Sequence, residues 1–314
     1  MLHLRAVCPA ERTEAALDVL RRHAGATHLV LLRGAAVEPP GDLVEADVAR
    51  EATDEILAAL CELGIDRDGG VTLEVIDTSL SDHADRAEEA APGDGSDAIV
   101  WEELISRTGE ESKPSWTFQA FLTIACLLAA VGIATDSPVT IVGAMVVGPE
   151  FGPLAAIAVG LVARRWDLVK RAAVALGIGF PVAMAVTAVF ALAGAFTGLF
   201  DRAAVFGDQH QVDFIYDLSA YSLIVAMLAG AAGVLSLTSA KSAALVGVFI
   251  SVTTVPAAGY AALASVLGEW DRAGKSLLQL LINLIGIVAA AALVLLIRRR
   301  GATDGVTTRP LSSG

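Results

Sequence analysis

A single acidic residue, Glu150, stands inside a long apolar stretch at residues 138–163. A run of this length can cross a bilayer, and Glu150 falls about 12 residues into it, near the bilayer centre. A carboxylate there is costly and usually faces a bundle interior or a water-filled cavity. Glu150 is predicted either to bind a cation or proton, or to be a structural acid. A structural acid would be protonated, hydrogen-bonded or brought to the interface by a re-entrant segment.

Residues that interrupt helices surround this acid. Pro149 precedes it, and Gly152 and Pro153 follow it. Proline removes an amide donor and clashes with the preceding turn, so the helix is predicted to break here. The backbone groups freed by a break inside a bilayer must face protein, a cavity or a ligand.

A second copy of the pattern lies 104 residues further along the chain. Residues 141–146 align with residues 245–250, which pairs Gly143 with Gly247, and Pro256 follows the second copy. A unit of three spans reverses direction across the membrane, so the two halves are predicted to be inverted repeats. Paired broken segments in inverted repeats point to a central site in secondary transporters.

These observations predict an intramembrane site where the two broken segments meet. Its candidate residues are Glu150, Pro149, Gly152, Pro153, Asp136, Asn283, Thr253, Thr254 and Pro256. Glu150 and Asp136 lack a partner base or metal, and the membrane half has no phosphate-cradling loop or nucleophile–base pair. We therefore expect no enzymatic activity, no catalytic residues and no cofactor.

Histidines and cysteines give weaker signals. The histidines that could suggest a metal site are His3, His23, His28 and His83. Their spacings match no ligand set, and the two strand histidines are expected on opposite faces, so no metal site is predicted. The cysteines are far apart and are interpreted as small hydrophobic residues rather than disulfide partners.

Charge divides the chain into two parts. Residues 1–113 carry 10 Lys/Arg and 25 Asp/Glu, whereas the rest carries 12 Lys/Arg and 10 Asp/Glu. Such a change marks a domain boundary, and the acidic part argues against nucleic acid as a partner.

The acidic part reads as a small α+β domain. Strands are predicted at residues 2–7, 27–32, 42–50 and 71–76, and helices at residues 11–23 and 51–63. This order is that of the ferredoxin-like fold. The predicted domains are a ferredoxin-like domain at 1–77, an acidic linker with a juxtamembrane helix at 78–115, a transmembrane domain at 116–297 and a tail at 298–314.

The second part reads as an α-helical polytopic membrane domain. Six apolar stretches are long enough to span a bilayer, at residues 116–135, 138–163, 172–200, 218–238, 242–267 and 276–297. Cations cluster after the second, fourth and sixth stretches, so both termini are predicted to be cytoplasmic in a multi-pass cell-membrane protein.

The same motifs resemble a known family, the domain of unknown function 389 (DUF389). The matching residues in the first half are Asp136-Ser137-Pro138, Gly143-Ala144-Met145, Pro149 and Gly152-Pro153. Those in the second half are Gly247-Val248, Pro256 and Asn283. The resemblance covers residues 101–296 and implies a multispanning protein, but supplies no activity or ligand. Glu150 departs from the family, which usually has an apolar residue there, and Thr254-Val255-Pro256-Ala257 replaces a usual double proline.

Two functions remain open from the sequence. The leading hypothesis is a transporter or channel for a small solute or ion, gated by the acidic domain. The alternative is a non-transporting membrane sensor or scaffold whose soluble domain binds a ligand or protein. The expected partners are a lipid bilayer, an unidentified small solute or ion, and further copies of the chain. A polar cavity between the second and fifth stretches would favour transport.

Overall fold

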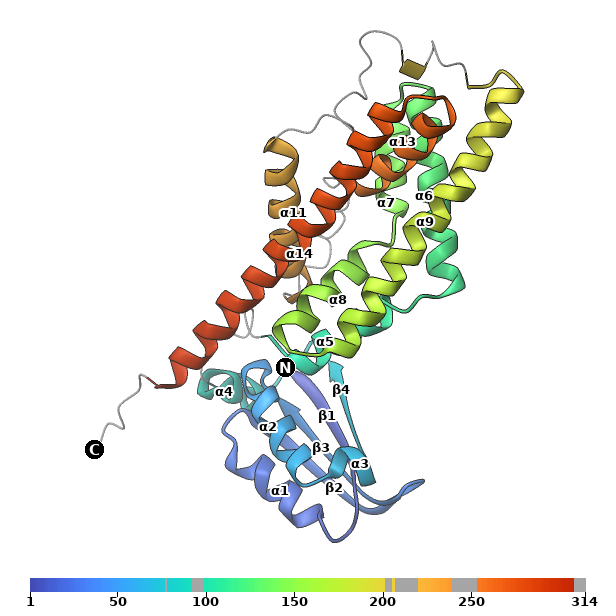
Figure 1. Cartoon of the computed structure of the whole chain (residues 1–314). Helices are drawn as coiled ribbons and strands as arrows, with labels where there is room; N and C mark the ends of the chain where they lie inside the picture. Colours follow the sequence, from blue (N-terminus) through green and yellow to red (C-terminus); the bar gives the residue numbers. More distant parts are fainter. Residues whose placement is uncertain (77, 92–98, 201–204, 207–219, 239–252, 308–314) are drawn as a thin grey trace. The chain divides into compact units, whose positions relative to one another are not determined.

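The computed structural model describes residues 1–76, 78–91, 99–200, 205–206, 220–238 and 253–307 (Figure 1). The chain divides into two compact units. The first contains residues 1–104 together with the end of the chain from Gly301, and the second contains residues 105–300. Each unit is described by itself.

The first unit is built on a four-stranded antiparallel sheet. Its strands are β1 (Leu2–Cys8), β2 (Ala26–Val37), β3 (Pro40–Val48) and β4 (Gly70–Val75), in the order β2-β3-β1-β4. The helices α1 (Thr13–Arg22) and α2 (Arg50–Glu62) connect them, and a short helix α3 (Ile65–Asp68) precedes β4. The predicted strands and helices are all present, and α3 is an addition.

Alternation along the strands places the core on one face of the sheet. In β1, Leu2, Leu4, Ala6 and Cys8 are buried, and the residues between them are more exposed. Successive side chains of a strand point to opposite faces, so this pattern leaves one face for helices to cover. The helices α1 and α2 lie along the sheet (Figure 1). They contribute leucine and isoleucine side chains to the same core.

A further helix follows the sheet where the sequence predicted only a linker. The helix α4 (Asp82–Ala90) buries Ala84 and Ala87, which are one turn apart among acidic residues. The Ser81 side chain accepts hydrogen bonds from the first-turn amides, and the Met1 amino group pairs with Glu88 at 2.8 Å. Small apolar residues at helical spacing and an N-cap outweigh the polar composition here. The next helix in the chain is α5 (Trp101–Glu111).

The second unit consists of apolar helices. They are α6 (Trp116–Ala134), α7 (Pro138–Val147), α8 (Phe151–Val162), α9 (Trp166–Phe196), α11 (Ala220–Thr238), α13 (Thr254–Val266) and α14 (Trp270–Thr307). In the described part of the chain, four helices are long and apolar enough to cross a membrane, or five if the bent pair α7 and α8 forms one span. The prediction of six spans is therefore only partly supported. Of the predicted span at residues 242–267, the part before Thr253 lies outside the described residues.

The helices follow the 104-residue offset found in the sequence. The helix α11 begins and ends 104 residues after α6, and α13 ends 104 residues after α8. The helix α14 begins at Trp270, 104 residues after the first residue of α9, Trp166. The preceding turns also correspond, because Arg164 and Gly268 both adopt positive φ, at 58° and 82°. A left-handed residue just past a helix end is a common C-terminal cap.

The first prediction concerns the core of the first unit. Residues 1–111 should fold as an isolated fragment, and Leu60→Ala should destabilise it by about 2–5 kcal/mol because Leu60 is fully buried. Leu32→Ala is the control, since Leu32 is 48% exposed and should change stability by only about 0.5 kcal/mol. Urea unfolding followed by Trp101 fluorescence measures both. A fragment without a cooperative transition would contradict this prediction.

A pH dependence follows from Asp54 in α2. Burial raises the pKa of Asp54 to about 6, against the hydrogen bond that the Trp101 amide donates to it, and the charge of Glu102 adds to the rise. Because this pKa exceeds the unfolded value of 3.8, the folded state keeps a proton that the unfolded state releases between these values. Stability from this group is therefore lost as the pH rises from about 4 to about 6.

Comparison with Asp54→Asn isolates this effect. The fragment carrying Asp54→Asn should gain stability relative to the wild type as the pH rises through that window. Urea unfolding at several pH values measures the difference. Parallel curves for the two proteins would show that Asp54 titrates alike in both states.

Candidate functional site

The bent pair α7 and α8 contains the candidate site. The helix α7 ends at Val147 and α8 begins at Phe151, and their axes differ by 49°. Gly148, Pro149 and Glu150 form the break between them. The break predicted at this place is therefore present.

The prolines act differently from the sequence prediction. Pro153 is the third residue of α8, and Pro256 is the third residue of α13. In the first turn of a helix the proline amide would have no intrahelical partner, so proline is tolerated there without a kink. Pro149 lies in the break itself, and the other two prolines start the helices that follow.

Glu150 is buried at the break and contacts the other half of the unit. It is 6% exposed, and its Oε1 accepts a hydrogen bond of 2.5 Å from Thr254 Oγ1. These two residues are 104 apart in the chain, so they correspond to each other in the sequence alignment of the halves. The contact brings together the two segments that were predicted to meet.

Two amide side chains extend the contact along α14. Asn283 Nδ2 donates to Thr253 Oγ1 at 3.0 Å, and Gln279 Nε2 donates to the same atom at 3.4 Å. Residues four apart lie on one face of a helix, so both amides reach the start of α13. We call these five residues the Glu150 cluster, consisting of Glu150, Thr253, Thr254, Gln279 and Asn283.

Two helix N-termini meet at this cluster. Glu150 is the residue before α8, and Thr253 is the residue before α13. The first amides of a helix lack intrahelical acceptors and carry partial positive charge, which favours a carboxylate beside them. The arrangement therefore offsets part of the cost of burying Glu150.

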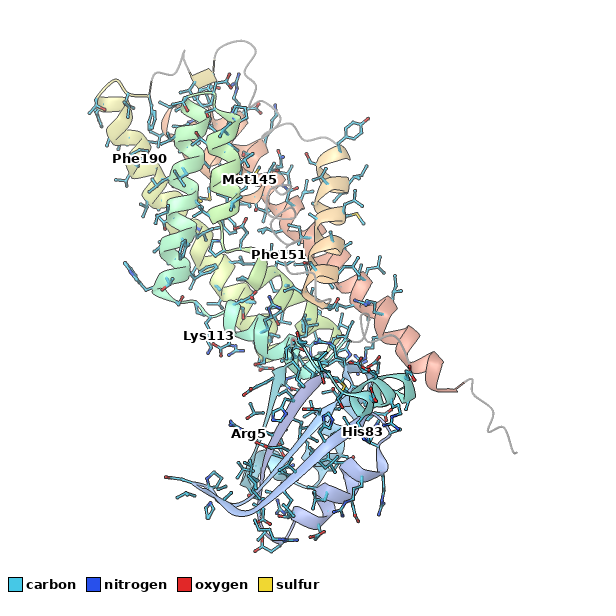
Figure 2. The ribbon with its side chains drawn as sticks, turned by 180° about the vertical axis from the view of Figure 1, so that it is seen from behind. Arg5, His83, Lys113, Met145, Phe151 and Phe190 are labelled. Carbon is cyan, nitrogen blue, oxygen red and sulfur yellow. The ribbon has the colours of Figure 1, made fainter. Side chains whose placement is uncertain are left out.

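A cavity of about 460 Å³ lies on the side of the break that faces α6 and α11. Its lining residues are Glu110, Glu111, Lys113, Ser115, Thr117, Phe118, Phe121, Pro149, Phe151, Gly152 and Leu237. Pro149 and Gly152 flank Glu150 in sequence, and Figure 2 labels Phe151 and Lys113. This cavity differs from the expected one, because its lining residues come from the end of α5 and the segment after it, from α6, from the break and the start of α8, and from α11, and not from α13.

The other predicted residues lie away from the cluster. Asp136 follows α6 and is separated from the break by the 10 residues of α7, about 15 Å at about 1.5 Å per residue. No described hydrogen bond or ion pair joins it to Glu150. Gly143 is exposed on α7, where a side chain would meet no neighbouring atom within 4 Å. Gly247 lies outside the described residues.

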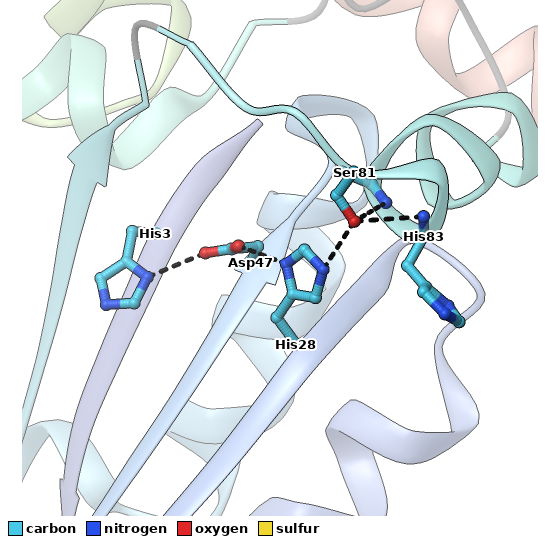
Figure 3. Close-up of polar contacts among 6 residues, drawn as sticks. His3, His28, Asp47, Ser81 and His83 are labelled. Carbon is cyan, nitrogen blue, oxygen red and sulfur yellow. Dashed lines mark hydrogen bonds and ion pairs between the residues drawn. The ribbon is translucent and has the colours of Figure 1, made fainter.

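The first unit contains a separate polar network on its sheet (Figure 3). Asp47 on β3 binds two histidines, His3 Nδ1 at 2.8 Å and His28 Nδ1 at 2.7 Å. His28 Nε2 lies 2.9 Å from Ser81 Oγ at the start of α4, and the His83 ring lies beside His28. The expectation that the strand histidines lie on opposite faces was wrong. His3 pairs with Asp47 across β1 and β3, and His28 reaches the same carboxylate with a positive φ of 51°.

The number of donors limits the hydrogen-bond directions in this network. Ser81 Oγ accepts from the amides of His83 and Ala84, which uses both of its lone pairs. When the His28 ring is neutral, the Ser81 hydroxyl proton therefore points to His28 Nε2, and His28 Nδ1 carries the proton donated to Asp47. A serine held in this way caps a helix and is not free to act as a nucleophile.

The electrostatics of Asp47 agree with a structural role. Burial raises the pKa of Asp47, but the hydrogen bonds with His3 and His28 oppose burial and hold the pKa below its ordinary value. Among the described residues, no group of three His, Cys, Asp or Glu side chains could hold a metal ion.

Some of these residues had recognisable signals in the sequence. Gln279 and Asn283 are polar residues four apart in or beside an apolar stretch, which marks one face of a buried helix. Asp47 and Ser81 could not be found from the sequence. Their contacts depend on strand register and on the unpredicted helix α4.

The network generates a prediction about α4. Ser81→Ala should destabilise the fragment 1–111 by about 1 kcal/mol, because it removes the cap of α4 and the hydrogen bond to His28. Ser81→Thr keeps a hydroxyl and should lose less. Urea unfolding measures the stability of the fragment and of both variants. Equal stability of the wild type and Ser81→Ala would contradict this prediction.

The chain is similar to a known protein family and to a curated protein. Residues 145–289 match the sequence model of the family described as "Domain of unknown function (DUF389)". The chain is also similar to "Uncharacterized protein MJ0678" of Methanocaldococcus jannaschii, with 24% identity over 207 residues. That match covers 66% of this chain and 62% of the relative, so the chain spans less than two thirds of that protein's length. No solved structure matches the chain. The resemblance seen in the sequence is confirmed over residues 145–289, which match the DUF389 family model.

Proposed function

We propose that this protein is a membrane transporter or channel for a small solute or ion, with the Glu150 cluster as its central site. The observation that carries the proposal is the buried carboxylate of Glu150 at a helix break, bound to Thr254 from the corresponding segment. Broken helices that meet in this way form substrate and ion sites in secondary transporters. Polar groups at such a depth must face protein, water or a ligand.

The 104-residue correspondence supports a 3+3 inverted repeat around this site. Three pairs of helices share the offset, and each unit of three spans would run in the opposite direction to the other. Six spans with both termini in the cytoplasm accord with the distribution of Lys and Arg. In this proposal the chain carries its acidic domain on the cytoplasmic side and acts in the cell membrane.

The first unit supplies the regulatory part of the proposal. Its β-α-β-β-α-β order and the sheet order β2-β3-β1-β4 support a ferredoxin-like fold. The edge strand β2 exposes Val30 and Leu32, and edges of this kind pair with other chains. We infer a homo-oligomer in which this domain controls the membrane half, without enzymatic activity of its own.

A sensor or scaffold is the second candidate. The observation that favours it is the network of His3, Asp47, His28 and Ser81. This network connects β1, β2 and β3 to the start of α4. In that case the first unit binds a ligand or partner and the membrane half only anchors it.

Flux measurements test the proposal. Wild-type protein in proteoliposomes should carry at least one ion in a panel of Na⁺, K⁺, H⁺ and Cl⁻. Glu150→Gln should fold and assemble but lower that flux by about tenfold or more, which equals about 1.4 kcal/mol. Thr187→Val is the control, because Thr187 is a buried hydroxyl on α9 that bonds only within its own helix in the described structure.

The outcomes separate the two candidates. Flux that is lost in Glu150→Gln and kept in Thr187→Val supports a transport site at Glu150. Equal flux in wild type and Glu150→Gln removes Glu150 from the mechanism. A folded wild-type protein that moves none of the ions or small solutes tested supports the sensor or scaffold.

A further inference from the structure

The Glu150 cluster contains acceptor oxygens without donors. Glu150 Oε2, Gln279 Oε1 and Asn283 Oδ1 have no hydrogen-bond partner among the described residues. These residues are only 6%, 1% and 2% exposed. Buried polar atoms are almost always satisfied, so three such atoms in one cluster call for a ligand, an ion or water.

The residues that carry the three oxygens all contact the start of α13. Both amide nitrogens donate to Thr253 Oγ1, and the next residue, Thr254, binds Glu150. Because the nitrogens are used by the threonine, the two amide oxygens remain for another partner. Carboxylate and amide oxygens are the ligands that hard cations prefer.

Charge decides which cation fits. Glu150 is the one charged side chain among the buried residues in the described part of 105–300. It supplies a single negative charge, and the N-termini of α8 and α13 offset part of it. A divalent cation would leave excess positive charge in an apolar surrounding, which is costly. A monovalent cation leaves less excess positive charge than a divalent one.

The number of unpaired oxygens separates a metal cation from a proton. A proton on Glu150 satisfies one carboxyl oxygen and offers one donor, so at least one amide oxygen would remain unpaired. An alkali-metal cation takes several oxygen ligands, so it can satisfy carboxylate and amide oxygens together. We propose that the Glu150 cluster binds one dehydrated alkali-metal cation, such as Na⁺, through Glu150, Gln279 and Asn283. This rests on the proposed function, because it names the class of ion handled at that site.

Cation-dependent stability of the full-length protein in detergent tests this proposal. The melting temperature is measured while NaCl or KCl replaces N-methyl-D-glucamine chloride at constant ionic strength and pH. A cation that binds only the folded state stabilises it, so the melting temperature should rise and saturate with Na⁺ or K⁺.

Three variants assign the effect to the cluster. Glu150→Gln should abolish the rise, and Asn283→Leu should weaken the apparent affinity by about tenfold or more. Ser276→Ala should keep the rise, because Ser276 is a buried hydroxyl on the same helix that binds the Ala257 carbonyl at 2.8 Å. If Glu150→Gln does not yield folded protein, equilibrium binding of radioactive sodium to the wild type replaces it. One displaceable Na⁺ per chain then supports the proposal, and no saturable binding overturns it.

The remaining outcomes distinguish the ion from the transport function. A melting temperature that responds to neither Na⁺ nor K⁺ overturns the proposal. Flux that persists in Glu150→Gln after cation binding is lost supports this inference and shows that transport does not depend on the cation bound at the cluster. Cation binding at the cluster without any flux supports this inference and removes the transport function.

Discussion

The cost of burying one carboxylate organises the membrane half of this protein. Glu150 sits among apolar helices, where an unpaired charge is strongly unfavourable. The partial positive charges of two helix N-termini and the hydrogen bond from the Thr254 hydroxyl stabilise this carboxylate. Each of these groups depends on a helix that starts at the cluster, so the break between α7 and α8 is a requirement of the site. Gly148 permits the break, because a side chain there would meet Val255 at 2.8 Å and the carboxylate itself.

The 104-residue offset explains how the chain produces such a meeting point. The helices α6, α8 and α9 have counterparts in α11, α13 and α14, and the turns before α9 and α14 share a left-handed residue. Glu150 and Thr254 are 104 residues apart and are joined by a hydrogen bond. The two halves differ at this point, since one supplies a carboxylate and the other a hydroxyl, so only one negative charge is buried.

Sequence reasoning succeeded where a local pattern carries the information. Strict alternation predicted the strands of the first unit, and the proline and glycine residues around Glu150 predicted the break. The second repeat was also predicted to place Thr254 beside Glu150, and these two residues are in contact. Prediction from the sequence failed where a structure depends on residues that are far apart in the chain. Helix α4 has a polar composition and depends on Ala84 and Ala87 packing against the sheet, and the His3–Asp47–His28 network depends on strand register. Asp136 was grouped with Glu150 because both are acids, but a whole helix separates them.

The central claim is that the carboxylate of Glu150 receives a cation together with two amide oxygens. Infrared difference spectroscopy of the full-length protein, recorded on replacing N-methyl-D-glucamine with Na⁺, reports directly on carboxyl and amide carbonyl groups. The account predicts a difference spectrum in the carboxyl and side-chain amide bands that disappears in Glu150→Gln and persists in Ser276→Ala. A flat difference spectrum for the wild type, or one that Glu150→Gln leaves unchanged, would contradict it.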